Sequence, residues 1–266
     1  MTVENSASTQ GLITLAQLEK IRLILSTYQD GSGQLARPKG KTLPGWRDFE
    51  RAVALAFQGT AQESKAIYDV LVPLAEVPDT YYGIACKMRK LLRDVQRTGR
   101  VTIEVSNSSG KFWDVLQREG LDDFETAPVR AGEILLRLVA QWHDDVDIAH
   151  GGTIDTQKSF YLVLQWDEKT LTYQMYRYAL TFPDPLALSW SAQGRRLVGE
   201  DAHGVIIEWY GHSGGQLKYY PSIEQAIWVS EVFALEPLPE RDEEYGVLRK
   251  VREYYPELWQ RACELP

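Results

Sequence analysis

The stretch KAIYDVLVPLAEVPDTYYGIACKMRKLLRDVQRTGRVTIEVSN, residues 65–107, decides how the rest of the chain is organised. Residues 66–73 form an apolar run that predicts a strand, with one carboxylate, Asp69, inside it. A turn follows, and residues 81–86 predict a second strand that ends at Lys87. Charges buried in an apolar sheet are costly unless they are paired or bind a ligand, so this hairpin is the candidate functional site.

The remainder of the stretch adds a basic segment and a third strand. Residues 87–100 contain six basic residues and one acid, and they predict a basic helical segment. Residues 100–106 predict a strand that carries Glu104. Carboxylates on neighbouring strands can hold Mg²⁺ through oxygen ligands, and a lysine beside them can orient or deprotonate an attacking water. We expect Glu104 to lie on the strand paired next to the hairpin and to complete such a site.

Helices and further strands are predicted on both sides of this stretch. Residues 13–28 have apolar residues at helical spacing, and residues 46–58 predict an amphipathic helix with Glu50 in its first turn. Residues 29–45 between them predict an exposed, mobile loop. Further helices are predicted over residues 110–119, 131–142, 222–233 and 243–263, a hairpin from residue 160, and strands over residues 186–190, 204–210 and 216–220.

We therefore expect an α/β fold, in which helices flank a mixed central sheet, with a β-rich C-terminal portion and a helical tail. Three regions follow from this division. Residues 1–45 would hold the N-terminal helix and the mobile loop, and residues 46–145 a catalytic core. Residues 146–266 would hold the β-rich portion and the C-terminal helices.

Composition and charge are those of a soluble globular protein. The chain has 266 residues, of which 44% are hydrophobic and 25% charged, and no apolar run approaches the roughly 20 residues that span a bilayer. Its two cysteines form neither a disulfide framework nor a CxxC zinc pair, and the first residues carry no export signal, so a cytoplasmic location without a membrane partner is expected. A net charge of −8 argues mildly against non-specific nucleic-acid binding, although local basic surfaces matter more.

The ordered elements resemble the core of the PD-(D/E)xK nuclease superfamily. GWRDFERAVALAFQG, residues 45–59, resembles the first core helix, with Glu50 at a position that often supports the metal. IYDVLV, residues 67–72, followed by YYGIACK, residues 81–87, resembles the catalytic hairpin. RVTIEVSNSSGKFWDVL, residues 100–116, resembles the fourth strand and second core helix. The resemblance covers about residues 46–120.

One position departs from the family pattern. Ala85 stands two residues before the lysine, where the family usually has Asp or Glu. Some type II restriction endonucleases resemble this variant: they have a small residue, then Cys, then Lys, and they recruit a carboxylate from a later element. Ala85-Cys86-Lys87 with Glu104 downstream is similar to that arrangement.

Two choices stay open at this stage. Asp79, after Pro78, matches the letters of the motif, but it falls where the hairpin should turn, so Asp69 is the preferred aspartate. Asp69 and Lys87 can equally form a structural ion pair. Glu104 can simply face solvent, because residues 101–106 alternate between apolar and polar side chains.

The resemblance implies a Mg²⁺-dependent type II restriction endonuclease that hydrolyses phosphodiester bonds in a specific double-stranded DNA sequence. Asp69 and Glu104 would hold the metal, Lys87 would position the water, and Glu50 would support the site. Symmetric cleavage would require a two-fold homodimer. DNA contacts are predicted at Lys39, Lys41, Arg89, Lys90, Gln216 and Lys218.

The rival hypothesis is a non-catalytic DNA-binding protein that keeps a nuclease-like scaffold. Ala85 in place of an acid and the net charge of −8 favour it. A metal cluster in the acidic loop at His143, Asp144, Asp145, Asp147 and His150 is also conceivable from the residue types, but these residues lack the regular spacing of a known site. A third hypothesis, a small-molecule enzyme, has little support, because the sequence contains no Gly-rich phosphate loop and no HExxH helix.

Overall fold

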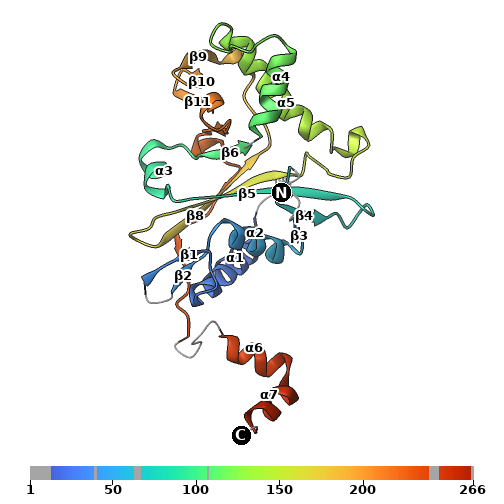
Figure 1. Cartoon of the computed structure of the whole chain (residues 1–266), viewed down its shortest axis with the longest axis vertical. Helices are drawn as coiled ribbons and strands as arrows, with labels where there is room; N and C mark the ends of the chain where they lie inside the picture. Colours follow the sequence, from blue (N-terminus) through green and yellow to red (C-terminus); the bar gives the residue numbers. More distant parts are fainter. Residues whose placement is uncertain (1–12, 39–40, 63–66, 107, 240–245, 265–266) are drawn as a thin grey trace, which may run out of the picture.

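The computed structural model describes residues 13–38, 41–62, 67–106, 108–239 and 246–264, and its centre is a seven-stranded mixed sheet (Figure 1). The order along this sheet is β13-β8-β7-β5-β4-β3, and β14 also pairs with β8. Its strands are β3 (Thr60–Ala61), β4 (Val70–Pro73), β5 (Tyr81–Arg89), β7 (Phe160–Trp166), β8 (Thr172–Ala179), β13 (Trp228–Val229) and β14 (Phe233–Ala234). Only β5 and β7 run parallel to each other, and every other pair in the sheet is antiparallel.

Two helices, α1 (Leu15–Thr27) and α2 (Trp46–Phe57), cover one face of this sheet. Successive side chains of a strand point to opposite faces, and the alternate residues Ile84 and Cys86 of β5 belong to the apolar core under these helices. Thr14 caps α1 with a reciprocal pair of hydrogen bonds to Gln17, and Gln58 closes α2 in a left-handed conformation.

The other face of the sheet packs against a second core, which holds a five-stranded sheet and two helices. The strand order is β6-β12-β11-β10-β9, all antiparallel. Its elements are β6 (Ile103–Ser106), β9 (Ser189–Gln193), β10 (Arg196–Asp201), β11 (Gly204–Trp209) and β12 (Leu217–Tyr219), with α4 (Ser109–Arg118) and α5 (Pro128–Asp144). Trp209, which is fully buried, anchors this core between Phe112, Trp113 and Phe124.

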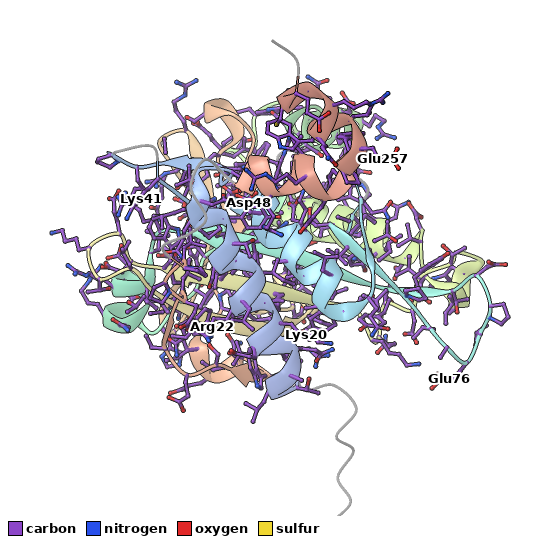
Figure 2. All side chains as sticks on the ribbon, turned by 90° about the horizontal axis from the view of Figure 1, so that it is seen from below. Lys20, Arg22, Lys41, Asp48, Glu76 and Glu257 are labelled. Atoms are coloured by element: carbon purple, nitrogen blue, oxygen red, sulfur yellow. The ribbon has the colours of Figure 1, made fainter. Side chains whose placement is uncertain are left out.

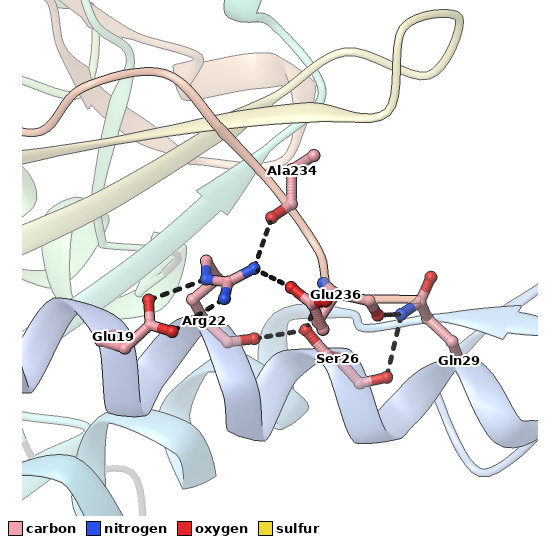
Figure 3. A network of polar contacts seen from close by, with 6 residues as sticks. All are labelled: Glu19, Arg22, Ser26, Gln29, Ala234 and Glu236. Atoms are coloured by element: carbon pink, nitrogen blue, oxygen red, sulfur yellow. Dashed lines mark hydrogen bonds and ion pairs between the residues drawn. The ribbon is translucent and has the colours of Figure 1, made fainter. Parts of the chain in front are cut away.

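The C-terminal segment returns to α1 before the last two helices begin. Arg22 of α1 bonds Glu19, Glu236 and the carbonyl of Ala234, while Ser26 accepts the Glu236 backbone N–H (Figure 3). The helices α6 (Val247–Tyr254) and α7 (Pro256–Cys263) then lie beyond the α1–α2 layer (Figures 1 and 2). No helix in the described part of the chain is long and apolar enough to cross a membrane.

Several predicted elements are confirmed, namely the helices at α1, α2, α4 and α5, the β4–β5 hairpin and the β7–β8 hairpin. The helix predicted over residues 222–233 is wrong. Ser222 caps a single 3-10 turn, and Trp228 and Phe233 then pair with the edge of β8 as short strands. The predicted loop at residues 29–45 contains a two-stranded sheet, β1 (Leu35–Ala36) with β2 (Thr42–Leu43), whose preceding turn is bonded to the buried Asp48 carboxylate.

The third strand of the deciding stretch has a different partner from the predicted one. β6 pairs with β12 in the five-stranded sheet, and β7 is the strand that lies beside β5. Residues 87–89 belong to β5, so the basic helix α3 is shorter than predicted, Leu92–Thr98. Both sheets therefore take strands from either side of residue 145, and the expected boundary there is not a boundary between sheets.

Candidate functional site

The β4–β5 hairpin brings Asp69 and Lys87 into contact. The Lys87 Nζ lies 3.3 Å from the Asp69 Oδ2, and the same oxygen accepts the Cys86 backbone N–H at 2.8 Å. Both side chains are partly exposed, Lys87 to 22% and Asp69 to 29%, so the pair is open to solvent. Asp79 lies in the exposed turn of the same hairpin with a φ of 56°, as its position in the sequence suggested.

A second carboxylate, Glu50 of α2, lies close enough to Cys86 of the hairpin to influence the pKa of its thiol. Cys86 lies beneath the hairpin at 5% exposure, and burial raises the pKa of its thiol well above the usual range. The carboxylates of Asp69 and Glu50 raise the pKa of this thiol further, while Lys87 opposes them, so all three charges lie around Cys86. The thiol is therefore a protonated, buried group.

Glu104 has other partners. Its carboxylate forms an ion pair with Arg89 of β5 and accepts a hydrogen bond from the Gln216 amide. Lys218 lies directly opposite Glu104 in the β6–β12 pairing, with its Nζ 4.3 Å from the centre of the Tyr210 ring. The expectation that Glu104 lies on the strand next to the hairpin is therefore wrong, because its strand pairs with β12.

Carboxylates neutralise the basic segment that follows the hairpin. Arg93 and Asp167 lie 2.7 Å apart, whereas Arg100 and Asp201 are 3.8 Å apart. Each of the six basic residues in residues 87–100 contacts an acid, in the pairs Lys87–Asp69, Arg89–Glu104, Lys90–Glu168, Arg93–Asp167, Arg97–Asp94 and Arg100–Asp201. Exposed pairs of this kind contribute only about 0–1 kcal/mol, so a polyanion can compete for the cations.

A polar surface of the five-stranded sheet faces α3. Glu104, Lys218 and Glu208 are register partners across β6, β12 and β11, so they form one row on the face opposite the apolar core. A cavity of about 600 Å³ lies between this face and α3, lined by Leu91, Asp94, Val95, Thr98 and Arg100 on one side and by Thr102, His203, Val205, Glu208 and Tyr220 on the other. The size is that of a small-ligand site.

The remaining predicted DNA contacts are scattered. Lys41 is exposed beside β2 and lies across the molecule from Glu76 of the hairpin turn (Figure 2). Lys39 lies outside the described residues. A cluster around Glu104 contains three of the predicted contacts, Arg89, Gln216 and Lys218. The sequence could not have shown this cluster, because Glu104 and Gln216 are separated by 112 positions in the chain.

The acidic loop after α5 is organised by hydrogen bonds. His143 Nδ1 lies 2.9 Å from the Tyr68 hydroxyl, and burial lowers the pKa of His143 to about 4. Asp147 accepts hydrogen bonds from Ala149 and Thr156, which lower the pKa of its carboxyl. No group of three or more His, Cys, Asp or Glu side chains arranged for a metal occurs within residues 13–264 where the structure describes them.

The donor set near Lys87 suits one kind of metal. Both contacts of the Asp69 carboxylate are made by Oδ2, so its Oδ1 has no contact among the described residues. Mg²⁺ is commonly bound through one or two carboxylates, with waters and substrate phosphate completing its octahedron. Asp69 and Glu50 fit that limited role, whereas a closed site made of protein ligands alone does not fit here.

Comparison of the chain with models of known protein families, with curated proteins and with solved structures finds no match.

Proposed function

We propose that the chain is a Mg²⁺-dependent nuclease that hydrolyses phosphodiester bonds in double-stranded DNA, similar to type II restriction endonucleases. The observation that carries the proposal is the contact of Asp69 with Lys87 on adjacent strands, at 3.3 Å. On a partly exposed hairpin, an aspartate that can bind a metal beside a lysine that can orient water would support metal-assisted hydrolysis.

The order of elements also supports this proposal. Helix α2 is followed by the strands β3, β4 and β5, by a crossover that holds α3, β6, α4 and α5, and by β7, parallel to β5. Apart from β6, which joins the other sheet, this order is compatible with the helix–hairpin–helix–strand order of the PD-(D/E)xK resemblance, with α5 and β7 in the last two places. The sequence expectation had put residues 100–116 there instead.

Each residue has a definite part in the reaction. Asp69, with Glu50 in support, would hold Mg²⁺, which would neutralise charge on the phosphate when bound. Lys87 would orient the attacking water and balance charge at phosphorus. The water oxygen would bond to phosphorus and give up a proton to solvent while the bond from phosphorus to the 3′ oxygen breaks. The leaving 3′ oxygen would take up a proton from solvent, which leaves a 5′-phosphate and a 3′-hydroxyl. Glu104 has no part in this site, since Arg89 and Gln216 hold its carboxylate.

The test is incubation of plasmid DNA with the protein in Mg²⁺ and in EDTA. The parent protein should produce discrete fragments in Mg²⁺ only, and Asp69→Ala and Lys87→Ala should not cut. Asp79→Ala is the matched control, because it removes an exposed carboxylate from the same hairpin and should cut normally. If both site variants cut like the parent protein, the site is assigned wrongly.

A non-catalytic DNA-binding protein is the second candidate. The small number of carboxylates at the hairpin favours it, because Ala85 is buried to 2% exposure in the core and Glu104 is engaged elsewhere. Retarded DNA on a gel without strand scission under Mg²⁺, Mn²⁺ or Ca²⁺ would select this candidate.

Cleavage into discrete fragments that share defined ends would instead support a sequence-specific nuclease. A dimeric mass in solution would support symmetric cutting.

A further inference from the structure

Two hydrogen-bond donors contact the Glu104 carboxylate, and a cationic residue lies opposite it in the sheet. The donors are Arg89 and Gln216, and the cationic residue is Lys218. Arginine and lysine have no acceptor atoms, so this group of donors is suited to an anion. In the free protein that anion is the carboxylate of Glu104.

An unused donor lies beside this group. Gln165 of β7 is the register partner of Arg89 in the parallel β5–β7 pair, so the two side chains leave the sheet on the same face. Gln165 is fully buried, and neither its amide nitrogen nor its amide oxygen has a hydrogen-bond partner among the described residues. A buried amide without a partner costs free energy, which a ligand that accepts its N–H would recover.

This group is open to solvent and close to the candidate catalytic pair. The side chains of Arg89 and Glu104 are 31% and 25% exposed, so an anion from solution can reach them. Arg89 lies two residues after Lys87 on β5, so both side chains leave the strand on one face. An anion bound by Arg89 would therefore lie one strand step from the proposed reacting phosphate.

We infer that Arg89, Gln216 and Lys218 form a binding site for a backbone phosphate of the nucleic-acid substrate, and that Glu104 occupies this site as an internal competitor until the substrate displaces it. The choice of a nucleic-acid phosphate as the anion rests on the proposed nuclease function, whereas the contacts of Glu104 with Arg89 and Gln216 do not. Glu104 is thus a regulator of affinity, which differs from the metal ligand expected from the sequence.

The experiment measures binding of a fluorescein-labelled 20-base-pair DNA duplex by anisotropy, in EDTA so that no cleavage occurs. Glu104→Gln keeps the shape of the side chain and removes its charge, and it should bind the duplex about tenfold tighter than the parent protein. The dependence of log affinity on log salt should steepen by up to about 0.9, the value for one phosphate that meets a cation which Glu104 no longer neutralises. Arg89→Gln combined with Glu104→Gln should abolish both gains.

Glu236→Gln is the matched control, because it removes the same charge from a glutamate paired with an arginine, Arg22, on α1 at the opposite face of the sheet (Figure 3). It should change the affinity by no more than about twofold. Equal affinity of Glu104→Gln and the parent protein, an equal gain in Glu236→Gln, or a gain that survives Arg89→Gln would each overturn the inference. Because binding is measured without metal, this inference and the proposed nuclease function can fail separately. Glu104→Gln can fail to bind tighter while Mg²⁺-dependent cutting is observed, and it can bind tighter while no cutting is observed.

Discussion

Replacing Lys87 with methionine separates a functional pair from a structural one. The Lys87 and Asp69 side chains are 22% and 29% exposed, so their contact at 3.3 Å is worth about 0–1 kcal/mol of unfolding free energy. Methionine keeps most of the aliphatic stem, and the Asp69 carboxylate keeps its hydrogen bond from the Cys86 N–H at 2.8 Å. Lys87→Met should therefore change the unfolding free energy by less than about 1 kcal/mol.

Asp69→Ala gives the contrast on the same hairpin. It leaves the Cys86 N–H without its acceptor, on a residue only 5% exposed, and an unsatisfied buried donor costs about 1–3 kcal/mol. Urea unfolding followed by tryptophan fluorescence measures both variants, and plasmid cleavage in Mg²⁺ measures their activity. We expect both to be inactive and only Asp69→Ala to be clearly destabilised. Lys87→Met that cuts at the parent rate, or that unfolds more readily than Asp69→Ala, would refute the reasoning.

Two further predictions concern stability. Gly83→Ala should lower the unfolding free energy by about 1–3 kcal/mol, because a Cβ there would lie 2.1 Å from Cγ of the buried Tyr68 ring. Gly110→Ala should stabilise α4 slightly, because a Cβ there would have nothing within 4 Å. Thermal unfolding of the two variants compares these effects. Burial lowers the pKa of His143 to about 4, against a usual value of 6.5 in the unfolded chain. Between these two pH values the imidazole is neutral in the folded protein and charged in the unfolded chain. The unfolding free energy should therefore fall as the pH falls from 6.5 to 4, by about 3 kcal/mol in all. Urea midpoints measured across this range should lose that part of their pH dependence in His143→Gln, and an unchanged dependence would contradict the assignment.

Local patterns predicted the local parts of this fold. The apolar spacing of α2 predicted the helix, and the apolar runs within residues 67–72 and 81–87 predicted the hairpin, because these features depend on neighbours within a few residues. The contact of Asp69 with Lys87 followed from the hairpin itself. The exposed turn at Asp79 followed from the same pattern.

Long-range pairing is what the patterns could not predict. The alternation in β6 correctly separates Glu104 from the apolar face, but it does not say which strand lies beside it, and the partner β12 is supplied from a distant part of the chain. Strand β10 was missed because its apolar core, Leu197 and Val198, is too short to stand out between polar residues. Residues 222–233 became edge strands because β8 offered an unpaired edge, a fact of the assembled sheet.

The most direct test of a metal site at Asp69 is the binding of Mn²⁺, a spectroscopic substitute for Mg²⁺. Electron paramagnetic resonance measures this binding in the parent protein, in Asp69→Asn and in Asp79→Asn. Asparagine replaces each carboxylate at nearly constant shape, and it tolerates the left-handed conformation at position 79. We expect one site in the parent protein and in Asp79→Asn, and none in Asp69→Asn. Equal Mn²⁺ binding by all three proteins would contradict a metal site at the β4–β5 hairpin. The absence of Mn²⁺ binding by the parent protein in the presence of uncleaved DNA would contradict it as well.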